Sequence, residues 1–291
     1  MASDFSTFHL TRRGFLISGA VALASAKGMP TTPSCALNAE QEVGPYYIDD
    51  EKLRQDITEG KPGVPVKLRV ALVDAKRCTP LENASLDIWH CDALGVYSGF
   101  TANSPDGDMR GPGGPPPGGP PPGGPRPGGP PPGGWGGPGP GRMGPPPARQ
   151  TDATRFLRGV QLTDKQGIAE FTTLYPGWYH GRTIHIHLKV HLGGGVSGAK
   201  YAGGHVSHTG QLFFPEDVTE QVSRLAPYAK RLSVHRTLQS EDNIFKTQQG
   251  SASMVSLTRL EKGSDAGGFL ATVTLAVDPE AVPAPVGFGP R

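Results

Sequence analysis

The chain has 291 residues, of which 36% are hydrophobic and 19% are charged, and its formal net charge is +2. So small a charge excludes the electrostatic footprint of a nucleic-acid-binding protein. No apolar run reaches the roughly 18 residues that a membrane-spanning helix needs. The length suits one sizeable domain with its own hydrophobic core, which we expect over residues 27–291.

The first 26 residues have the features of an export signal. Arg12 and Arg13 precede a short apolar stretch over residues 15–26, which ends in an Ala-Ser-Ala sequence similar to a cleavage site. This pattern is typical of a bacterial twin-arginine (Tat) signal. It predicts an exported protein, periplasmic or secreted, with no membrane anchor after the signal is removed. An ordinary N-terminal helix is the alternative interpretation.

Alternating apolar residues predict several short β-strands along the rest of the chain. The expected strands are 66–72, 86–91, 160–163, 168–174, 183–192 and 269–277. Residues 164–167 are typical of a hairpin turn, so the two strands that flank them are expected to pair. One short helix is expected over residues 217–225. Many short strands between turns predict an all-β fold, a β-sandwich of mostly antiparallel strands with long loops.

A low-complexity segment at residues 111–147 interrupts the predicted strands. Gly and Pro make up 33 of its 37 residues, in an approximate five-residue rhythm. A collagen helix requires Gly at every third position, so this segment cannot form one. Because it has almost no apolar side chains to offset the entropy of ordering, we expect a disordered insertion within the domain.

The chain has three cysteines, Cys35, Cys78 and Cys91. An oxidising compartment permits one disulfide and leaves one free thiol, and the sequence leaves all three pairings open. No two of these cysteines have the C-x-x-C spacing of many structural zinc sites, so a cysteine-bound zinc is not indicated.

A pair of histidines on one predicted strand indicates a metal site. In residues 183–192 the Ile, Leu and Val side chains share one face, and His185 and His187 share the other. Two imidazoles at this spacing can supply two nitrogens to one metal ion. The alternative is a solvated polar face that is rich in histidine. His90 and His180 are further candidate ligands if the register differs.

Aromatic and cationic residues immediately precede this histidine pair. Arg182 is permanently charged and repels a metal ion unless an anion lies nearby. Tyr179 could supply that anion, because a highly charged cation lowers the pKa of a phenol far below its usual value of about 10. A purely structural tyrosine corner is the competing interpretation of Tyr179.

Three segments of the chain together resemble the intradiol ring-cleavage dioxygenases. Residues 86–98 are similar to the first signature of that family, residues 175–187 to the second, and residues 41–47 to its Gly-Pro-Tyr segment. The shared pattern is Tyr, then Tyr, then Arg-x-x-His-x-His, in that order. The spacing between Tyr179 and His185 is shorter than in the catechol and protocatechuate enzymes. In this respect the sequence resembles a short, secreted branch of the family.

This resemblance implies a β-sandwich with a non-haem Fe(III) ion between its sheets. It also implies four iron ligands, which are Tyr97, Tyr179, His185 and His187. Tyr179 corresponds to the tyrosinate that leaves the iron when substrate binds, and the freed phenolate would accept a substrate proton. By the same resemblance, the substrate-contacting residues are expected to be Arg182, which steadies charge on the ring, Gln211 and Tyr46.

The predicted function is that of an oxidoreductase that uses dioxygen to cleave a catechol-type aromatic 1,2-diol between its hydroxylated carbons, giving a muconate-type diacid. The expected partners are this small diol and dioxygen, with a homo-oligomer as a further option. One alternative is an exported β-sandwich that binds a partner without catalysis. The other is a zinc-dependent hydrolase that uses His185 and His187, although no carboxylate ligand is evident.

Overall fold

The computed structural model describes residues 35–50, 52–103, 147–284 and 286. The predicted export signal and, apart from Pro147, the Gly/Pro insertion lie outside the described residues. Within the described part, eight strands and two short α-helices follow one another: β1 (Pro65–Asp74), β2 (Ser85–Trp89), β3 (Arg158–Leu162), β4 (Ile168–Leu174), β5 (His185–Ser197), β6 (Lys200–Phe213), α1 (Glu216–Ser223), α2 (Asn243–Thr247), β7 (Ser256–Glu261) and β8 (Ser264–Val277).

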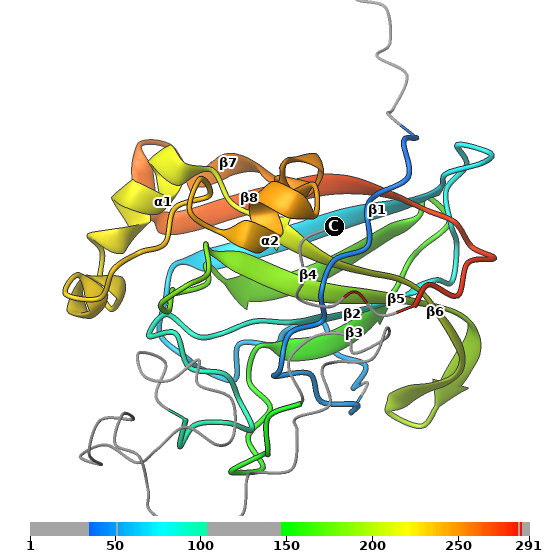
Figure 1. Cartoon of the computed structure of the whole chain (residues 1–291), viewed down its shortest axis with the longest axis horizontal. Coiled ribbons are helices and arrows are strands. Elements are labelled where there is room, and N and C mark those ends of the chain that lie inside the picture. Colours follow the sequence, from blue (N-terminus) through cyan, green and yellow to red (C-terminus); the bar gives the residue numbers. More distant parts are fainter. Residues whose placement is uncertain (1–34, 51, 104–146, 285, 287–291) are drawn as a thin grey trace, which may run out of the picture. The chain divides into compact units, whose positions relative to one another are not determined.

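The strands form two four-stranded sheets (Figure 1). One sheet has the order β4–β1–β8–β7 and the other has the order β3–β2–β5–β6. Among these strands, β1 and β8 run parallel, and the other pairs are antiparallel. The predicted all-β sandwich of mostly antiparallel strands is confirmed.

The main hydrophobic core consists of alternate residues from both sheets. Val66, Leu68 and Val70 of β1 belong to it, as do Ile186 and Leu188 of β5. Removing each such side chain from water stabilises the fold by about 1.5–3 kcal/mol. Because successive side chains of a strand point to opposite faces, the histidines that alternate with these residues lie on the outer face of their sheet.

The turn at residues 164–167 forms, but the expected hairpin does not. β3 pairs with β2, whereas β4 pairs with β1 in the other sheet. The turn therefore carries the chain from one sheet to the other. Turn-forming residues specify a reversal of the chain and not the partner of the strand that follows, which is why the sequence pattern led to the wrong pairing.

Three elements of the fold were not among those expected from the sequence: β6, β7 and α2. β6 is rich in Gly and His and lacks a clear alternation over its first half, where it is largely exposed. The predicted helix at 217–225 corresponds to α1. α2 has only five residues, which is too short for a helical period to stand out.

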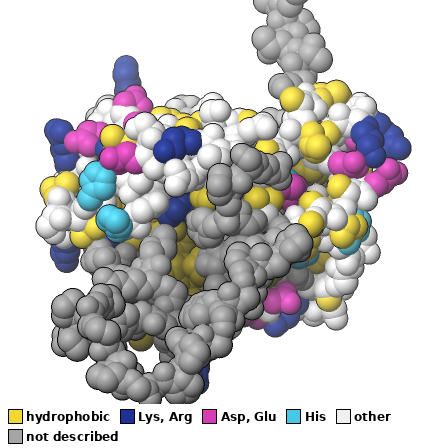
Figure 2. Space-filling view, in the orientation of Figure 1, with side chains coloured by type: hydrophobic (Ala, Val, Ile, Leu, Met, Phe, Trp, Pro, Cys, Tyr) yellow, Lys and Arg dark blue, Asp and Glu magenta, His cyan; other side chains and the backbone are white. Residues whose placement is uncertain are grey.

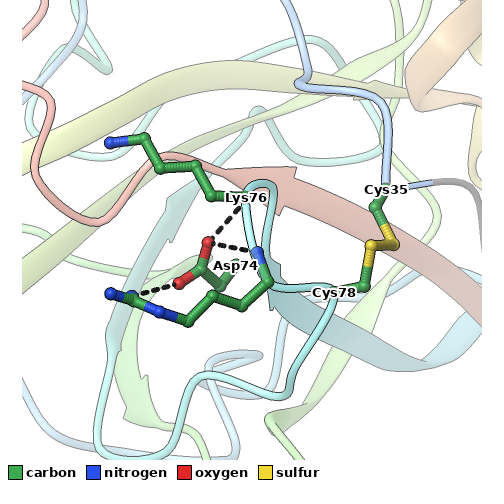
Figure 3. Close-up of a disulfide and its surroundings, with 5 residues drawn as sticks. Cys35, Asp74, Lys76 and Cys78 are labelled. Carbon is green, nitrogen blue, oxygen red and sulfur yellow. Dashed lines mark hydrogen bonds and ion pairs between the residues drawn. A yellow bond between two sulfur atoms is a disulfide. The ribbon is translucent and has the colours of Figure 1, made fainter.

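A disulfide joins Cys35 to Cys78 and selects one of the three pairings that the sequence left open (Figure 3). Cys91 is free and buried. The turn that carries Cys78 is held by Asp74, whose carboxylate accepts hydrogen bonds from the backbone N–H groups of residues 76 and 77 and from the Arg77 side chain. The disulfide therefore attaches the start of segment 35–50 to a firmly held turn.

Charges of both signs are mixed on the described surface. On the face shown in Figure 2, Lys and Arg side chains lie beside Asp and Glu side chains. Arg259, for example, pairs with Asp265 at 2.5 Å, and Arg224 pairs with Glu220 at 2.9 Å. In the described residues no helix is both long and apolar enough to cross a membrane.

Candidate metal centre

Four side chains from three places in the fold bring their polar atoms together. Tyr97 lies in the loop after β2, Tyr179 lies in the segment before β5, and His185 and His187 lie on β5. The two phenol oxygens are 3.3 Å apart, the Tyr179 oxygen is 3.3 Å from His185 Nε2, and the two imidazole Nε2 atoms are 3.0 Å apart. All four side chains are buried.

These separations fit four atoms that share one small cation. Two ligand atoms that are each about 2.1 Å from a metal ion, at roughly a right angle, lie about 3.0 Å from each other. Two of the four donors are phenols, which is why no group of three His, Cys, Asp or Glu side chains forms a metal site among the described residues. A zinc site with a carboxylate ligand therefore finds no support here.

The two imidazoles are set up to offer lone pairs. His185 Nδ1 lies 2.6 Å from the Thr183 carbonyl oxygen, which can only accept, so Nδ1 carries the proton and Nε2 is left with its lone pair. Burial lowers the pKa of His185 to about 3 and lowers the pKa of His187 well below its usual value. Both rings are therefore neutral at neutral pH, as metal ligation requires.

Burial has the opposite effect on the two phenols. It raises the pKa of Tyr97 and of Tyr179 well above the ordinary value, and the Arg182 charge only partly opposes this effect at Tyr179. Without a cation both tyrosines are neutral. A trivalent ion reverses this balance, and two phenolates then leave one net positive charge at the centre. This hard, oxygen-containing donor set fits Fe(III).

The two tyrosine-bearing segments meet through their backbones. The Gly177 N–H donates to the Asp92 carbonyl oxygen at 3.1 Å. A Cβ atom at Gly177 would lie 2.5 Å from that same oxygen, so only glycine permits this approach. Arg231 donates to the Trp178 carbonyl oxygen at 2.9 Å and fixes the chain just before Tyr179.

Aromatic side chains pack around the donors. Trp89 stacks on His187 with ring centroids 5.0 Å apart and an interplanar angle of 3°. Tyr46 stacks on Tyr97 at 4.7 Å. Trp89, Tyr97 and Tyr179 belong to a second, smaller hydrophobic cluster, separate from the core between the sheets. The centre therefore lies on the outer face of the β3–β2–β5–β6 sheet, and the expected position between the sheets is wrong.

Arg182 and Gln211 lie together beside this centre. Arg182 Nη2 donates to Gln211 Oε1 at 2.5 Å, and Gln211 is the cross-strand partner of His187. Both side chains are buried. The Gln211 amide nitrogen donates to the Glu42 carbonyl oxygen at 2.9 Å, which holds segment 41–47 against β6. The structure thus gathers the predicted substrate-contacting residues around the four donors.

Two alternative ligands are excluded by their surroundings. His90 is buried, but its Nδ1 donates to the Cys91 carbonyl oxygen and its Nε2 bonds the Thr173 hydroxyl, each at 2.7 Å. Both ring nitrogens are thus engaged away from the donor cluster. His180 is exposed to solvent.

Sequence reasoning missed two buried carboxylates that flank Arg182. Asp242 Oδ2 accepts from Arg182 Nε at 3.0 Å, and Glu42 Oε1 lies 4.0 Å from Arg182 Nη1. Asp242 precedes a short helix and could have been identified as a helix cap. Nothing in the sequence indicates that its partner lies 60 residues earlier.

The structure is similar to solved dioxygenases. It matches a dioxygenase with 28% sequence identity and a TM-score of 0.62, over 85% of this chain and 96% of the other. It also matches an intradiol ring-cleavage dioxygenase from Tetranychus urticae, with 27% identity and a TM-score of 0.63, over 87% of this chain and 99% of the other. No protein-family model matches the chain, and no curated protein matches it.

These similarities confirm the resemblance that the two sequence signatures predicted. The structure shares the fold of a solved intradiol ring-cleavage dioxygenase, and the similarity supports an oxidoreductase that incorporates dioxygen. The likeness extends over most of the chain and over nearly the whole length of both solved structures.

Proposed function

We propose that this protein binds a non-haem Fe(III) ion through Tyr97, Tyr179, His185 and His187 and cleaves a catechol-type aromatic 1,2-diol between its two hydroxylated carbons, giving a muconate-type diacid. The observation that carries the proposal is the convergence of two phenol oxygens and two imidazole nitrogens, with successive separations of 3.0–3.3 Å. The ferric ion, when bound, would draw electron density from the substrate and make it reactive toward dioxygen.

Tyr179 is the residue best placed to take a proton from the diol. Its oxygen lies between the Tyr97 oxygen and His185 Nε2, at 3.3 Å from each. Burial raises its pKa, so a Tyr179 phenolate that is released from a cation is strongly basic and picks up a proton readily. Tyr97 and the histidines would stay in place and orient the substrate.

Arg182 would steady negative charge as it develops on the substrate. It is buried, permanently charged and held by Gln211 and Asp242, so its orientation is set before the reaction begins. A fixed cation in a site without water typically contributes a few kcal/mol to the stabilisation of such charge. The aromatic packing of Trp89 and Tyr46 around the donors would exclude water and shape the pocket wall.

We also propose that the protein is exported through the twin-arginine signal at its N-terminus. The Cys35–Cys78 disulfide supports this proposal, because disulfides persist in oxidising compartments outside the cytoplasm. Detection of the processed protein in periplasmic or culture fractions, and its loss on Arg12→Lys/Arg13→Lys substitution, would test the route. Retention of the unprocessed protein in the cytoplasm would contradict it.

The decisive experiment combines colour with oxygen uptake. Purified iron-loaded protein should show the visible absorption band of a ferric tyrosinate and should consume dioxygen with catechol, hydroxyquinol or protocatechuate, and the product spectrum should be that of cleavage between the hydroxyls. Tyr97→Phe and Tyr179→Phe should each weaken or abolish the band. Tyr201→Phe is the matched control, because its hydroxyl bonds Gly194 and not a donor of the centre. A colourless iron-loaded protein, or a band unaffected by both substitutions, would contradict the proposal.

A further inference from the structure

Arg182 is held by a buried carboxylate whose two oxygens have separate tasks. Asp242 is fully buried. Its Oδ1 accepts from the backbone N–H groups of Ile244 and Phe245, at 2.7 and 3.2 Å, and so caps α2. Its Oδ2 accepts from Arg182 Nε at 3.0 Å and from the Thr183 N–H at 2.8 Å. A helix cap alone would need only the first oxygen.

We propose that Asp242 is a positioning residue for ring cleavage: its Oδ2 fixes the plane of the Arg182 guanidinium beside the four donors and, through Thr183, fixes the direction of the His185 lone pair. This inference rests on the proposed function. Asp242 caps α2 and lies outside residues 86–98 and 175–187, the two segments that resemble the family signatures. The proposal therefore gives α2 a part in the site that those segments do not indicate.

The effect on Arg182 follows from the geometry of its guanidinium. Nε is bound to Asp242 and Nη2 is bound to Gln211 Oε1. Two hydrogen bonds on two different nitrogens restrain both the plane and the direction of this planar group. The position of Nη1 is thereby set as well, and this atom lies 4.0 Å from Glu42 Oε1. Loss of the Asp242 bond would leave the guanidinium free to rotate about its contact with Gln211.

The effect on His185 passes through one peptide. The Thr183 N–H is bound to Asp242, and the Thr183 carbonyl oxygen accepts from His185 Nδ1 at 2.6 Å. Groups that bind the second nitrogen of a metal-ligating histidine set its tautomer and ring orientation. Asp242 therefore positions Thr183, and Thr183 in turn orients the ring of His185.

The substitution Asp242→Asn separates the two tasks of this carboxylate. An asparagine keeps one oxygen to cap α2, but its NH₂ group cannot accept from Arg182 or from Thr183. Asp74→Asn is a control of the same kind, because Asp74 is also buried and also accepts from backbone N–H groups and an arginine side chain, at the disulfide-bearing turn (Figure 3). Both variants lose a contact with an arginine side chain, and only Asp242→Asn loses it beside the donors, together with the contact to the Thr183 N–H.

The first test needs no iron. In the full-length protein without added metal, the Arg182 Nε–H should exchange slowly with solvent, as followed by NMR. Asp242→Asn should speed this exchange at least tenfold, whereas Asp74→Asn should leave it unchanged. Equal exchange in Asp242→Asn and the wild type would overturn the proposal.

The second test is a double-substitution cycle on the iron-loaded enzyme. Asp242→Asn should lower kcat at least tenfold with little change in KM for the diol. The loss should be clearly smaller when Arg182→Gln is already present, because only the route through Thr183 then remains. Equal losses in both backgrounds would indicate a merely structural role and overturn the proposal. If the wild type consumes no dioxygen with any diol, the proposed function fails, and the exchange measurement still decides whether Asp242 positions Arg182.

Discussion

Gly44 lies beside the donors at a position where a larger side chain would not fit. Gly44 adopts a φ of +70°, and a Cβ atom there would lie 2.9 Å from His187 Cε1. Glycine tolerates this backbone conformation, whereas other residues are strained in it by about 1–2 kcal/mol. Gly44 therefore combines an unusual turn with close contact to one of the four donor side chains.

Gly44→Ala should reduce iron binding beyond its effect on stability. The added methyl group must displace the His187 ring, so we expect iron content to fall several-fold and the free energy of unfolding to fall by about 1–2 kcal/mol. Gly60→Ala is the control, because Gly60 has a φ of +71° and nothing lies within 4 Å of its Cβ position. Metal analysis and thermal melts of both variants measure the difference. Equal iron content in the two would contradict the predicted clash.

Glu42 is a second residue whose surroundings dictate its behaviour. Burial raises its pKa to about 7, with Arg182 acting in the opposite direction, and in the described part of the chain its Oε2 has no hydrogen-bond partner. A pKa that is higher in the folded than in the unfolded chain favours folding at low pH. This contribution is fully present below about pH 4.5 and is lost as the pH rises through about 7.

Glu42→Gln should therefore change how stability depends on pH. At pH 8 the variant should be more stable than the wild type by up to about 3 kcal/mol, and near pH 4.5 the two should converge. Denaturant unfolding at several pH values measures this gap. The control is the same substitution at Glu82, whose side chain is exposed. A constant difference between Glu42→Gln and the wild type across pH 4.5–8 would contradict the assignment.

At the scale of elements, β5 contributes most to the site. It lies inside its sheet between β2 and β6, so its register is fixed on both sides. A shift by one residue would move both histidines into the main core and its apolar residues out of it. The other donors and Gly44 lie on loops, and those loops depend on the contacts that tie them to the sheets.

The disulfide is the covalent anchor of segment 35–50. Cys35→Ser/Cys78→Ser should lower the free energy of unfolding by about 2–4 kcal/mol, because the bond closes a loop with a sequence separation of 43 residues. Melts with and without reductant provide the measurement, and reductant should affect only the wild type. The same melting temperature in the double variant as in the oxidised wild type would contradict this prediction.

At the scale of the whole molecule, the apolar core that stabilises the fold and the cluster that carries the candidate donors lie on opposite faces of one sheet. The core between the sheets is apolar, whereas the donors and their aromatic neighbours form the separate cluster on the outer face. Tyr97 lies on a loop 82 residues before Tyr179, whereas Tyr179 and the two histidines belong to one short stretch of the chain. A bound ion would therefore add a cross-link between the Tyr97 loop and the segment that carries the other three donors.

Removal of iron should lower the melting temperature of the whole domain. A ligand that binds only the folded state stabilises it by about 4 kcal/mol when present at 1,000 times its dissociation constant. For a domain of this size that corresponds to roughly 10 °C. Melts before and after chelation measure the shift, and a Tyr97→Phe/Tyr179→Phe variant should show little of it. An unchanged melting temperature after complete iron removal would contradict the predicted cross-link.

Strand alternation and the two signatures were enough to predict the sandwich, β5 with its histidine pair, and the identity of the candidate donors. The strands and the shared face of the two histidines follow from a local pattern, because a period of two fixes which side chains share a face. The complete donor set was implied by the family resemblance. The pairing of β3 and β4 was predicted wrongly, and the outer-face position of the centre was not foreseen. Both depend on contacts between residues far apart in the chain.

The sequence by itself determined which residue types are present and which of them share one face of a strand. Only the tertiary structure decided that two phenols and two imidazoles meet with successive separations of 3.0–3.3 Å, that Cys35 pairs with Cys78, and that Asp242 faces Arg182. The physical reason is that a side chain's direction follows from its own backbone, whereas its neighbour across the fold follows from how whole sheets and loops pack.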